Sequence, residues 1–358
     1  MTWVVPLNLP TAMMAARFIL VVCWCLLGPA LSAQSTLPPP EGPLRSISFG
    51  SCNNQAQPQP MWQFVRQNQP QLWIWLGDNV YADTRNLELM RSKYQKQKNH
   101  PEYQKLRRDC QIIGTWDDHD YGVNDGGKEF PQRERSQQQL LDFLDVPAAA
   151  PARQRPGVYQ AYTYGEGEQK VKVILLDTRY FRDSLRILGQ GRTKRCLPNL
   201  EGDILGEAQW KWLRAQLTDS DASLHLIGSS IQVIPEQHRF EKWANFPGAR
   251  SRLFELLRET QAAHVVFLSG DRHVAEVSRF ELDGLATPLY EVTSSGITHT
   301  WREKREEDNR YRQGELIIER NFGVLQIDWS AERPRVIAEI RGVGNALLLQ
   351  RELDWSPD

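Results

Sequence analysis

The chain has 358 residues, and its 43 Lys and Arg against 44 Asp and Glu leave a net charge of −1. These totals show neither the basic excess typical of nucleic-acid-binding proteins nor a membrane-surface footprint. The length allows one large or two modest domains with a substantial core, and we expect a small-molecule partner or a compact headgroup.

The N-terminal segment has the composition of a secretory signal peptide. Residues 18–31, "FILVVCWCLLGPAL", are apolar, follow Arg17 and precede the small residues of "SAQS". The run is short for a membrane span, which needs about 20 apolar residues, so retention as an anchor is the less favoured alternative. We predict a signal peptide over 1–33, cleaved near Ala33, with no integral span afterwards. The mature protein would be secreted, periplasmic or attached to the cell surface.

A proline-rich spacer over 34–44 leads into a single predicted domain, 45–358. Helical periodicity over 207–217 and 249–260 predicts helices, and the charged, glutamine-rich stretch 85–156 predicts helices and loops around one strand. Apolar runs rich in β-branched and aromatic residues predict strands at 46–51, 72–77, 111–116, 171–178, 224–230, 264–270, 289–295, 322–329 and 335–342. This alternation of strands and helices predicts a layered α/β domain.

Cleavage of the signal would leave an odd number of cysteines, namely Cys52, Cys110 and Cys196. In an exported protein a disulfide between Cys110 and Cys196 would leave the Cys52 thiol free for other chemistry. The alternative is that all three are buried small side chains.

Reactive side chains follow the ends of four predicted strands. In an open α/β sheet, ligands bind in the crevice beyond the carboxyl ends of the strands, so we expect these side chains to share one site. The residues at these positions are Cys52, then Asp78, then Asp117, Asp118 and His119, and finally Asp271, Arg272 and His273.

So many carboxylates in one cleft would repel one another without a cation. Carboxylate oxygens suit calcium, magnesium or manganese, whereas thiolate, imidazole and phenolate suit iron or zinc. The mixed set therefore predicts at least two unlike metal positions, with Asp78 as the most plausible bridge between them. Each motif also has a plainer interpretation, because a glycine–aspartate pair after a strand is commonly a turn.

Taken together, the motifs resemble the alkaline phosphatase D, or PhoD-like, family of metallophosphoesterases. The match lies in "GSC", "GDNVYAD", "WDDHDYGVND", "LLDTRYFRD" and "SGDRH", in this order, and extends over about 45–341. The resemblance implies a four-layer fold of two mixed β-sheets flanked by helices. It also implies hydrolysis of phosphate mono- or diesters by a cluster associated with ferric iron and calcium, with zinc or manganese as alternatives.

The family pattern also implies roles for single residues. Cys52 and Tyr81 would bind the ferric ion, Asp78 would bridge to the harder cation, and His119 would protonate or stabilise the leaving oxygen. The opening "DxH" motif of the wider superfamily is absent, and Asp120 replaces a more frequent glutamate and is given no role. The complete set of implied metal ligands is Cys52, Tyr81, Asp78, Asp118, Asp271, His273 and, on a looser match, Asn124.

Other polar residues near these motifs are predicted to bind the substrate or support the site. Arg272 is a candidate for a bidentate grip on phosphate, and Arg179, beside Asp177, is expected in a buried ion pair. The loop 294–301, "SSGITHTW", is either an ordinary turn or a wall of the cleft that contacts the organic part of the ester. His238 and Trp243 could similarly line the entrance or, for the histidine, simply be exposed.

Two other functions remain open from the sequence. A glycoside hydrolase could use two of the aspartates of "WDDHD", Asp117, Asp118 and Asp120, as acid and nucleophile. This alternative leaves Cys52, Tyr81 and His273 unexplained. An exported calcium- or phosphate-binding protein without catalysis is the other. The sequence does not decide between monoesters, diesters and phospholipid headgroups as substrates.

Overall fold

The computed structural model describes residues 1–3, 37–301, 307–331 and 333–356. Beyond residues 1–3, the predicted signal peptide lies outside the described residues, as does the first part of the spacer, so these boundaries stay predictions. The chain divides into the units Met1–Leu31 and Ser32–Asp358, and the described helices and strands belong to the second. None of the helices described is both long enough and apolar enough for a transmembrane span.

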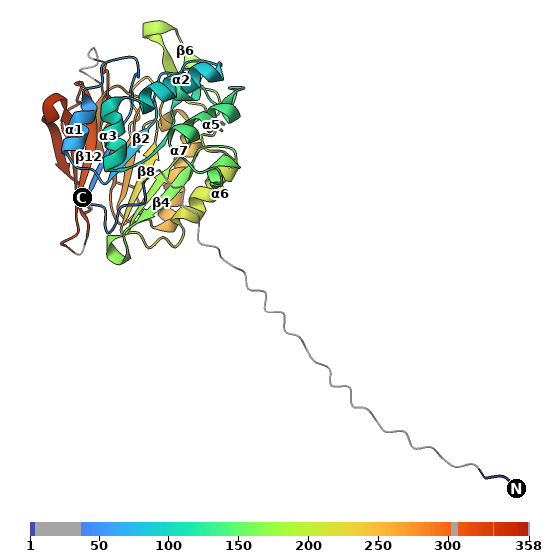
Figure 1. The fold of residues 1–358 in the computed structure, drawn as a ribbon. Helices are drawn as coiled ribbons and strands as arrows, with labels where there is room; N and C mark the ends of the chain where they lie inside the picture. Colours follow the sequence, from blue (N-terminus) through green and yellow to red (C-terminus); the bar gives the residue numbers. More distant parts are fainter. Residues whose placement is uncertain (4–36, 302–306, 332, 357–358) are drawn as a thin grey trace. The chain divides into compact units, whose positions relative to one another are not determined.

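Two mixed sheets form the centre of the second unit (Figure 1). In the first sheet β1, β2 and β3 run parallel, and β12, β13 and β14 continue it in antiparallel fashion beyond β1. The bounds of these strands are Ser46–Gly50 (β1), Leu72–Leu76 (β2), Gln111–Thr115 (β3), Asn321–Asp328 (β12), Arg335–Gly342 (β13) and Leu347–Glu352 (β14).

The second sheet has a parallel centre of β5, β8, β9 and β11, edged by the antiparallel strands β4 and β10. A separate hairpin pairs β6 with β7. The bounds are Gln160–Tyr164 (β4), Val171–Leu175 (β5), Arg186–Leu188 (β6), Arg195–Leu197 (β7), Leu224–Ser229 (β8), Val265–Ser269 (β9), Ala275–Phe280 (β10) and Leu289–Ser294 (β11).

Helices cover the outer face of each sheet and complete four layers, as the family resemblance implied. Buried side chains of α1, α2, α3 and α5 join the core that runs through the first sheet, whereas those of α6 and α7 pack with the second sheet in a separate cluster. The α-helices span Met61–Gln67 (α1), Leu87–Lys98 (α2), Pro101–Asp109 (α3), Asp118–Tyr121 (α4), Arg133–Phe143 (α5), Gly206–Leu217 (α6) and Pro247–Thr260 (α7). Single 3₁₀ turns span Pro151–Arg153 (η1), Gly167–Gln169 (η2), Gly191–Thr193 (η3), Trp243–Asn245 (η4) and Val343–Asn345 (η5).

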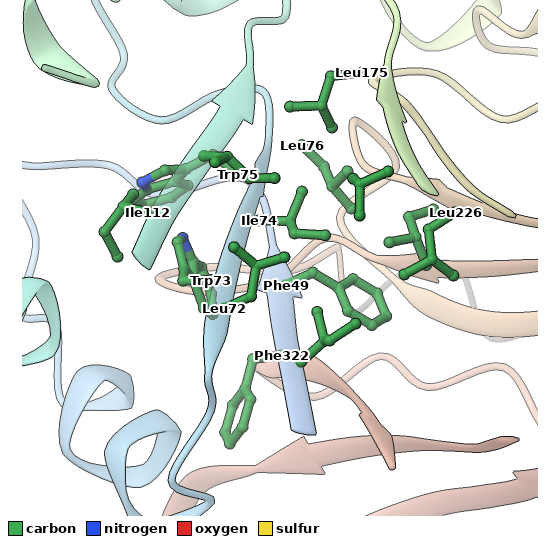
Figure 2. Packing of buried hydrophobic residues seen from close by; sticks show 14 of the residues in the cluster. Phe49, Leu72, Trp73, Ile74, Trp75, Leu76, Ile112, Leu175, Leu226 and Phe322 are labelled. Atoms are coloured by element: carbon green, nitrogen blue, oxygen red, sulfur yellow. The ribbon is translucent and has the colours of Figure 1, made fainter. Parts of the chain in front are cut away.

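Strand β2 is apolar at every position because both of its faces are covered. Trp73 and Trp75 point to the helical layer, where the ring of Trp62 in α1 meets theirs edge-on at 5.1 and 5.2 Å. Ile74 and Leu76 project from the opposite side of the strand, toward the second sheet (Figure 2). All five residues of β2 are fully buried, which fixes the strand whose end carries Asp78.

The predicted strands and the helical character of 85–156 are confirmed, whereas β4, β6, β7, β10 and β14 were not predicted. Of the two alternatives for the cysteines, the disulfide between Cys110 and Cys196 is wrong, since Cys52, Cys110 and Cys196 are all free and buried. Cys110 directly precedes β3, at the end of that strand remote from its carboxyl edge, while Cys196 lies in β7. The second alternative is therefore confirmed: all three cysteines are buried side chains without a disulfide.

Candidate metal centre

The loops after β1, β2, β3 and β9 approach one another closely at the carboxyl ends of the strands. A Cβ on Gly77 would lie 2.4 Å from the Cβ of Asp117, and a Cβ on Gly270 would lie 2.5 Å from Oγ of Ser51. Both contacts are shorter than real Cβ atoms make, so glycine is required at both positions. The glycine in "LGD" therefore allows the loops after β2 and β3 of the first sheet to approach each other, and the glycine in "SGD" allows the loop after β9 of the second sheet to meet the loop after β1 of the first.

Cys52, Asp78, Asp271 and His273 all have a left-handed backbone, with φ of 58°, 50°, 63° and 55°. This conformation is uncommon for residues other than glycine and costs on the order of 1 kcal/mol or more each. Such strain concentrates at functional sites, where the surrounding fold maintains it. Here it accompanies the reactive residues that end β1, β2 and β9.

A thiol, a phenol, an imidazole and a carboxylate converge at one end of the site. Sγ of Cys52 lies 3.4 Å from Oδ2 of Asp78, and the hydroxyl of Tyr81 lies 3.2 Å from the same oxygen. The hydroxyl of Tyr81 also lies 3.0 Å from Nε2 of His273. Ligand atoms of Cys52, Asp78 and His273 all lie within 4.8 Å of one another, close enough to share an ion.

The other end of the site consists mainly of carboxylates, and Asp78 belongs to both ends. Asp78, Asp118 and His119 form a second group of possible ligands, and Asp117, Asp118 and Asp271 form a third, by the same 4.8 Å criterion. Oδ2 of Asp118 accepts the backbone N–H of Asp125 at 2.6 Å. Among the described residues, Oδ1 of Asp118 and Oδ2 of Asp117 have no hydrogen-bond partner.

The carboxyl groups at this end are electrostatically unfavourable as anions by themselves. Burial, and then the neighbouring Asp117 and Asp118, raise the pKa of Asp271 well above its usual value. Burial also raises the pKa of Asp78 strongly; His119 opposes this effect, and Asp118 and Asp117 add to it. Buried carboxylates are normally paired or bind metals. The donor set, with two carboxylate oxygens lacking partners among the described residues, therefore fits bound cations.

His119 is held next to this cluster by a carboxylate. Its Nδ1 lies 2.6 Å from Oδ1 of Asp83, and its backbone N–H donates to Oδ1 of Asp78 at 3.3 Å. Burial lowers the pKa of His119, but Asp78 and the Asp83 hydrogen bond outweigh this and raise it to about 11. Asp118 beside it has a lowered pKa, because Arg179 and His119 outweigh the effect of burial.

A fully buried ion pair supports the loop after β3. Nε of Arg179 donates to Oδ1 of Asp117 at 2.6 Å, and Nη1 of Arg179 donates to Oε2 of Glu241 at 2.7 Å. The expectation of a buried ion pair at Arg179 is confirmed, but its partners are Asp117 and Glu241. The carboxylate of Asp177 instead accepts the backbone N–H groups of Arg179 and Tyr180, each at 2.9 Å.

Asp120, which had no predicted role, holds the same loop by hydrogen bonds to backbone. Its two oxygens accept the N–H groups of Asp117 and Asn79 at 2.7 and 3.1 Å. The first of these bonds belongs to a capping box in which Asp117 caps α4. Asp117 and Asp120 therefore help to position Asp118 and His119.

A cavity of about 290 Å³ opens beside these groups. Cys52 and Tyr81 lie behind the lining and contact Asp78. Segments with no recognisable motif also contribute to the wall, in particular the hairpin of β6 and β7 and the loop before η4. The lining residues are Asp78, Asp118, His119, Asn124, Asp125, Gly191, Lys194, Cys196, Arg239, Phe240, Glu241, Asp271, Arg272, His273 and Trp301.

Some predicted residues sit differently from what their motifs suggested. Asn124 is exposed, and its amide donates to Oδ2 of Asp125 at 2.8 Å. His238 and Trp243 are buried and do not line the cavity, which receives Arg239 and Phe240 from that loop instead.

Arg272 is a buried residue of the cavity wall. Its guanidinium pairs with Glu307 and lies 4.4 Å from the ring centroid of Phe240. Nε of Arg272 has no hydrogen-bond partner in the described part of the chain. Nη2 of the guanidinium is thus paired with Glu307, whereas Nε has no acceptor among the described residues.

The loop 294–301 lies next to two of the predicted metal ligands, Tyr81 and His273. Nε2 of His299 lies 3.0 Å from the hydroxyl of Tyr81. Trp301 is 49% exposed and its ring stacks on that of His273, with 5.4 Å between centroids. Of these two side chains, Trp301 lines the cavity and His299 touches a predicted ligand.

Comparisons with known proteins agree with this fold. Alkaline phosphatase D of Bacillus subtilis (strain 168) is 24% identical over 214 residues, which cover 52% of this chain and 34% of the relative, so the chain matches about a third of that protein. The solved structure of PhoD superposes with a TM-score of 0.65 at 16% identity, covering 90% of this chain and 74% of that one. A dimetal phosphatase from Danio rerio gives 0.51 at 12% identity, covering 88% and 100%. Structural likeness at these identities shows the fold. The family model for PhoD-like phosphatases matches residues 47–330, and the chain therefore belongs to the PhoD-like phosphatase family.

Proposed function

We propose that this protein is an exported, metal-dependent phosphoesterase of the alkaline phosphatase or phosphodiesterase type, which hydrolyses phosphate mono- or diesters. The observation that carries this proposal is the position of Asp78. Its carboxylate belongs both to the group with Cys52 and His273 and to the group with Asp118 and His119. One side chain can thus join two cation positions of different chemistry in a chain of this family.

The donors divide by hardness between two positions. Cys52, Tyr81 and His273, with Asp78, would hold a transition metal, for which we propose ferric iron, with zinc or manganese as alternatives. Asp78, Asp118, Asp271 and, with less support, Asn124 would hold a harder cation, for which we propose calcium. Held by these residues, the two cations would supply polarisation of the phosphoryl oxygens and would lower the pKa of a bound water from about 15.7 toward about 7.

The protein's own groups would position the ester and handle the proton. Because Nδ1 of His119 is held by Asp83, its Nε2 is the nitrogen that would give a proton to the departing alkoxide. The guanidinium of Arg272, which lines the cavity, would donate to a phosphoryl oxygen as attack on phosphorus proceeds in line. Phe240 and Trp301 line the same cavity and would contact the organic part of the ester.

The cavity size bears on the substrate. At about 290 Å³ it lies at the small end of ligand pockets, which typically measure about 300–1,000 Å³. We therefore propose a small phosphate ester, or the headgroup of a phospholipid, as the substrate. Export rests on the predicted signal peptide over 1–33.

The alternatives have less support from the geometry. Asp117 and Asp120 are fully buried and hydrogen-bonded, which leaves only Asp118 of the three carboxylates at the cavity. Glycoside hydrolysis needs two carboxyl groups that flank the bond. A phosphate- or calcium-binding protein without catalysis would use the same residues, and only a measurement of product release separates it from an esterase.

Release of alcohol from esters with good and poor leaving groups tests the proposal. We expect the wild-type protein to hydrolyse p-nitrophenyl phosphate or its bis ester as well as an alkyl phosphate. His119→Ala should slow the alkyl ester by about 10²-fold or more, within the range for general acid catalysis. It should slow the p-nitrophenyl esters much less, because p-nitrophenolate leaves without a proton.

The test is the kcat of the wild-type protein and of His119→Ala, each measured on the p-nitrophenyl esters and on the alkyl ester. Tight binding of phosphate without any product from wild-type protein would establish the binding-protein alternative. Equal losses on both ester types would remove His119 from the role of proton donor while leaving the esterase intact.

A further inference from the structure

The phenol of Tyr81 is confined by two histidines. Its hydroxyl lies 3.0 Å from Nε2 of His273 and 3.0 Å from Nε2 of His299. Its ring also contacts two imidazoles, with its centroid 4.1 Å from that of His119 and 5.1 Å from that of His299. His273 and His119 each belong to a group of possible metal ligands, but none of the three groups contains His299. His299 therefore contacts the phenol as an outer partner.

His299 is itself fastened to the loop that carries the thiol. Its Nδ1 lies 2.9 Å from the hydroxyl of Thr298. This hydroxyl accepts the backbone N–H of Asn54 at 2.8 Å and donates to the carbonyl of Cys52 at 3.1 Å. The backbone N–H of Thr298 also donates to the Cys52 carbonyl at 3.3 Å. A continuous set of hydrogen bonds thus connects the backbone of Cys52, through Thr298 and His299, to the phenol oxygen of Tyr81.

We propose that His299 is a positioning residue for the metal centre, which fixes the phenol oxygen of Tyr81 relative to the thiol of Cys52. This inference rests on the proposed function, in which Tyr81 and Cys52 hold the same cation. The loop after β2 and the loop after β1 carry these two ligands, and the loop after β11 carries His299. His299 therefore acts through Tyr81, and the predicted contact of this loop with the organic part of the ester falls to Trp301.

Residues that hydrogen-bond a metal ligand from outside the metal site affect metal binding. Removing such a partner typically costs about 10–100-fold in metal affinity or activity. The proposal predicts a loss in this range for His299→Ala, and a smaller loss for His299→Gln, whose amide can still bond the phenol oxygen. A role that is only structural would show no such rescue.

A double-mutant cycle between His299 and Tyr81 tests the proposal. Metal-stripped full-length protein is titrated with Zn²⁺, a probe that suits thiolate and imidazole donors, and kcat is measured on the reconstituted proteins. His299→Ala should weaken Zn²⁺ binding by about 10–100-fold in the wild-type background. In the Tyr81→Phe background the same change should have almost no further effect, because the group through which His299 acts is already gone.

A histidine outside the site provides the control. His100→Ala, at the start of α3 and outside the cavity, should leave Zn²⁺ binding unchanged, and denaturant unfolding of each variant verifies its fold. Equal losses from His299→Ala in both backgrounds, or no loss in either, would overturn the positioning role even if the enzyme is active. Absence of both Zn²⁺ binding and turnover in the wild-type protein would instead refute the proposed function.

Discussion

Replacement of Asp78 by alanine is expected to reduce turnover of phosphate esters by more than about 10²-fold and to lower the bound metal at the same time. Asp78 belongs to two of the three ligand groups, so its removal disturbs both proposed cation positions. Loss of an outer partner already costs about 10–100-fold, and loss of a shared ligand should exceed that. Parallel measurements of kcat and of metal content by elemental analysis check this result.

The stability of the metal-free variant separates this effect from unfolding. Burial and the neighbouring carboxylates raise the pKa of Asp78, so its charged form destabilises the fold when no cation is bound. Metal-free Asp78→Ala should therefore unfold at the same or a higher denaturant concentration than metal-free wild type. Asp109→Asn, an exposed carboxylate paired with Arg66, is the control and should change neither activity nor metal content. Unchanged turnover and metal in Asp78→Ala would contradict the bridging role.

Removal of the guanidinium of Arg179 should cause the largest loss of stability. Arg179→Met would leave the carboxylate of Asp117 buried without its cation, while Glu241 would keep only its pair with Arg182. Breaking a buried ion pair in this way typically costs about 3–5 kcal/mol in the free energy of unfolding. Urea or guanidinium denaturation of the metal-free proteins, followed by circular dichroism, measures it.

A surface pair provides the matched comparison for Arg179. Arg214→Met removes the partner of Glu259 where both side chains are about half exposed, and we expect a cost below about 1 kcal/mol. A loss of under about 1 kcal/mol for Arg179→Met as well would show that the buried cluster is not important for the fold.

The sequence was sufficient to predict the strands that are buried on both faces. β2 and β9 are almost continuous apolar runs, because helices lie on one side of each strand and the other sheet lies on the other side. β6 and β14 were missed for the opposite reason, since most of their residues are exposed and leave no apolar pattern. β10 was missed although it begins directly after the "SGDRH" motif.

The convergence of the side chains after β1, β2 and β3 could also be predicted, because parallel strands of one sheet end at the same edge. β9 belongs to the second sheet, and this argument does not cover it. The geometry within the site could not be predicted. The left-handed backbone of Cys52 and His273 depends on tertiary contacts, and it cannot be predicted from the residue types. The partners of Arg179 are equally remote in the chain, with Asp117 and Glu241 on opposite sides of it. Lys194 and Phe240 enter the cavity wall from segments without any motif.

Removal and return of metal tests the central claim most directly, namely that side chains from separate strands share cations that make phosphate ester hydrolysis possible. The purified protein is analysed for its elements, stripped with a chelator and assayed on p-nitrophenyl phosphate and its bis ester before and after metals are restored. We predict bound metal in the starting protein, loss of turnover in step with metal removal, and recovery when metals are returned. Full turnover by protein shown to be free of metal would contradict the account.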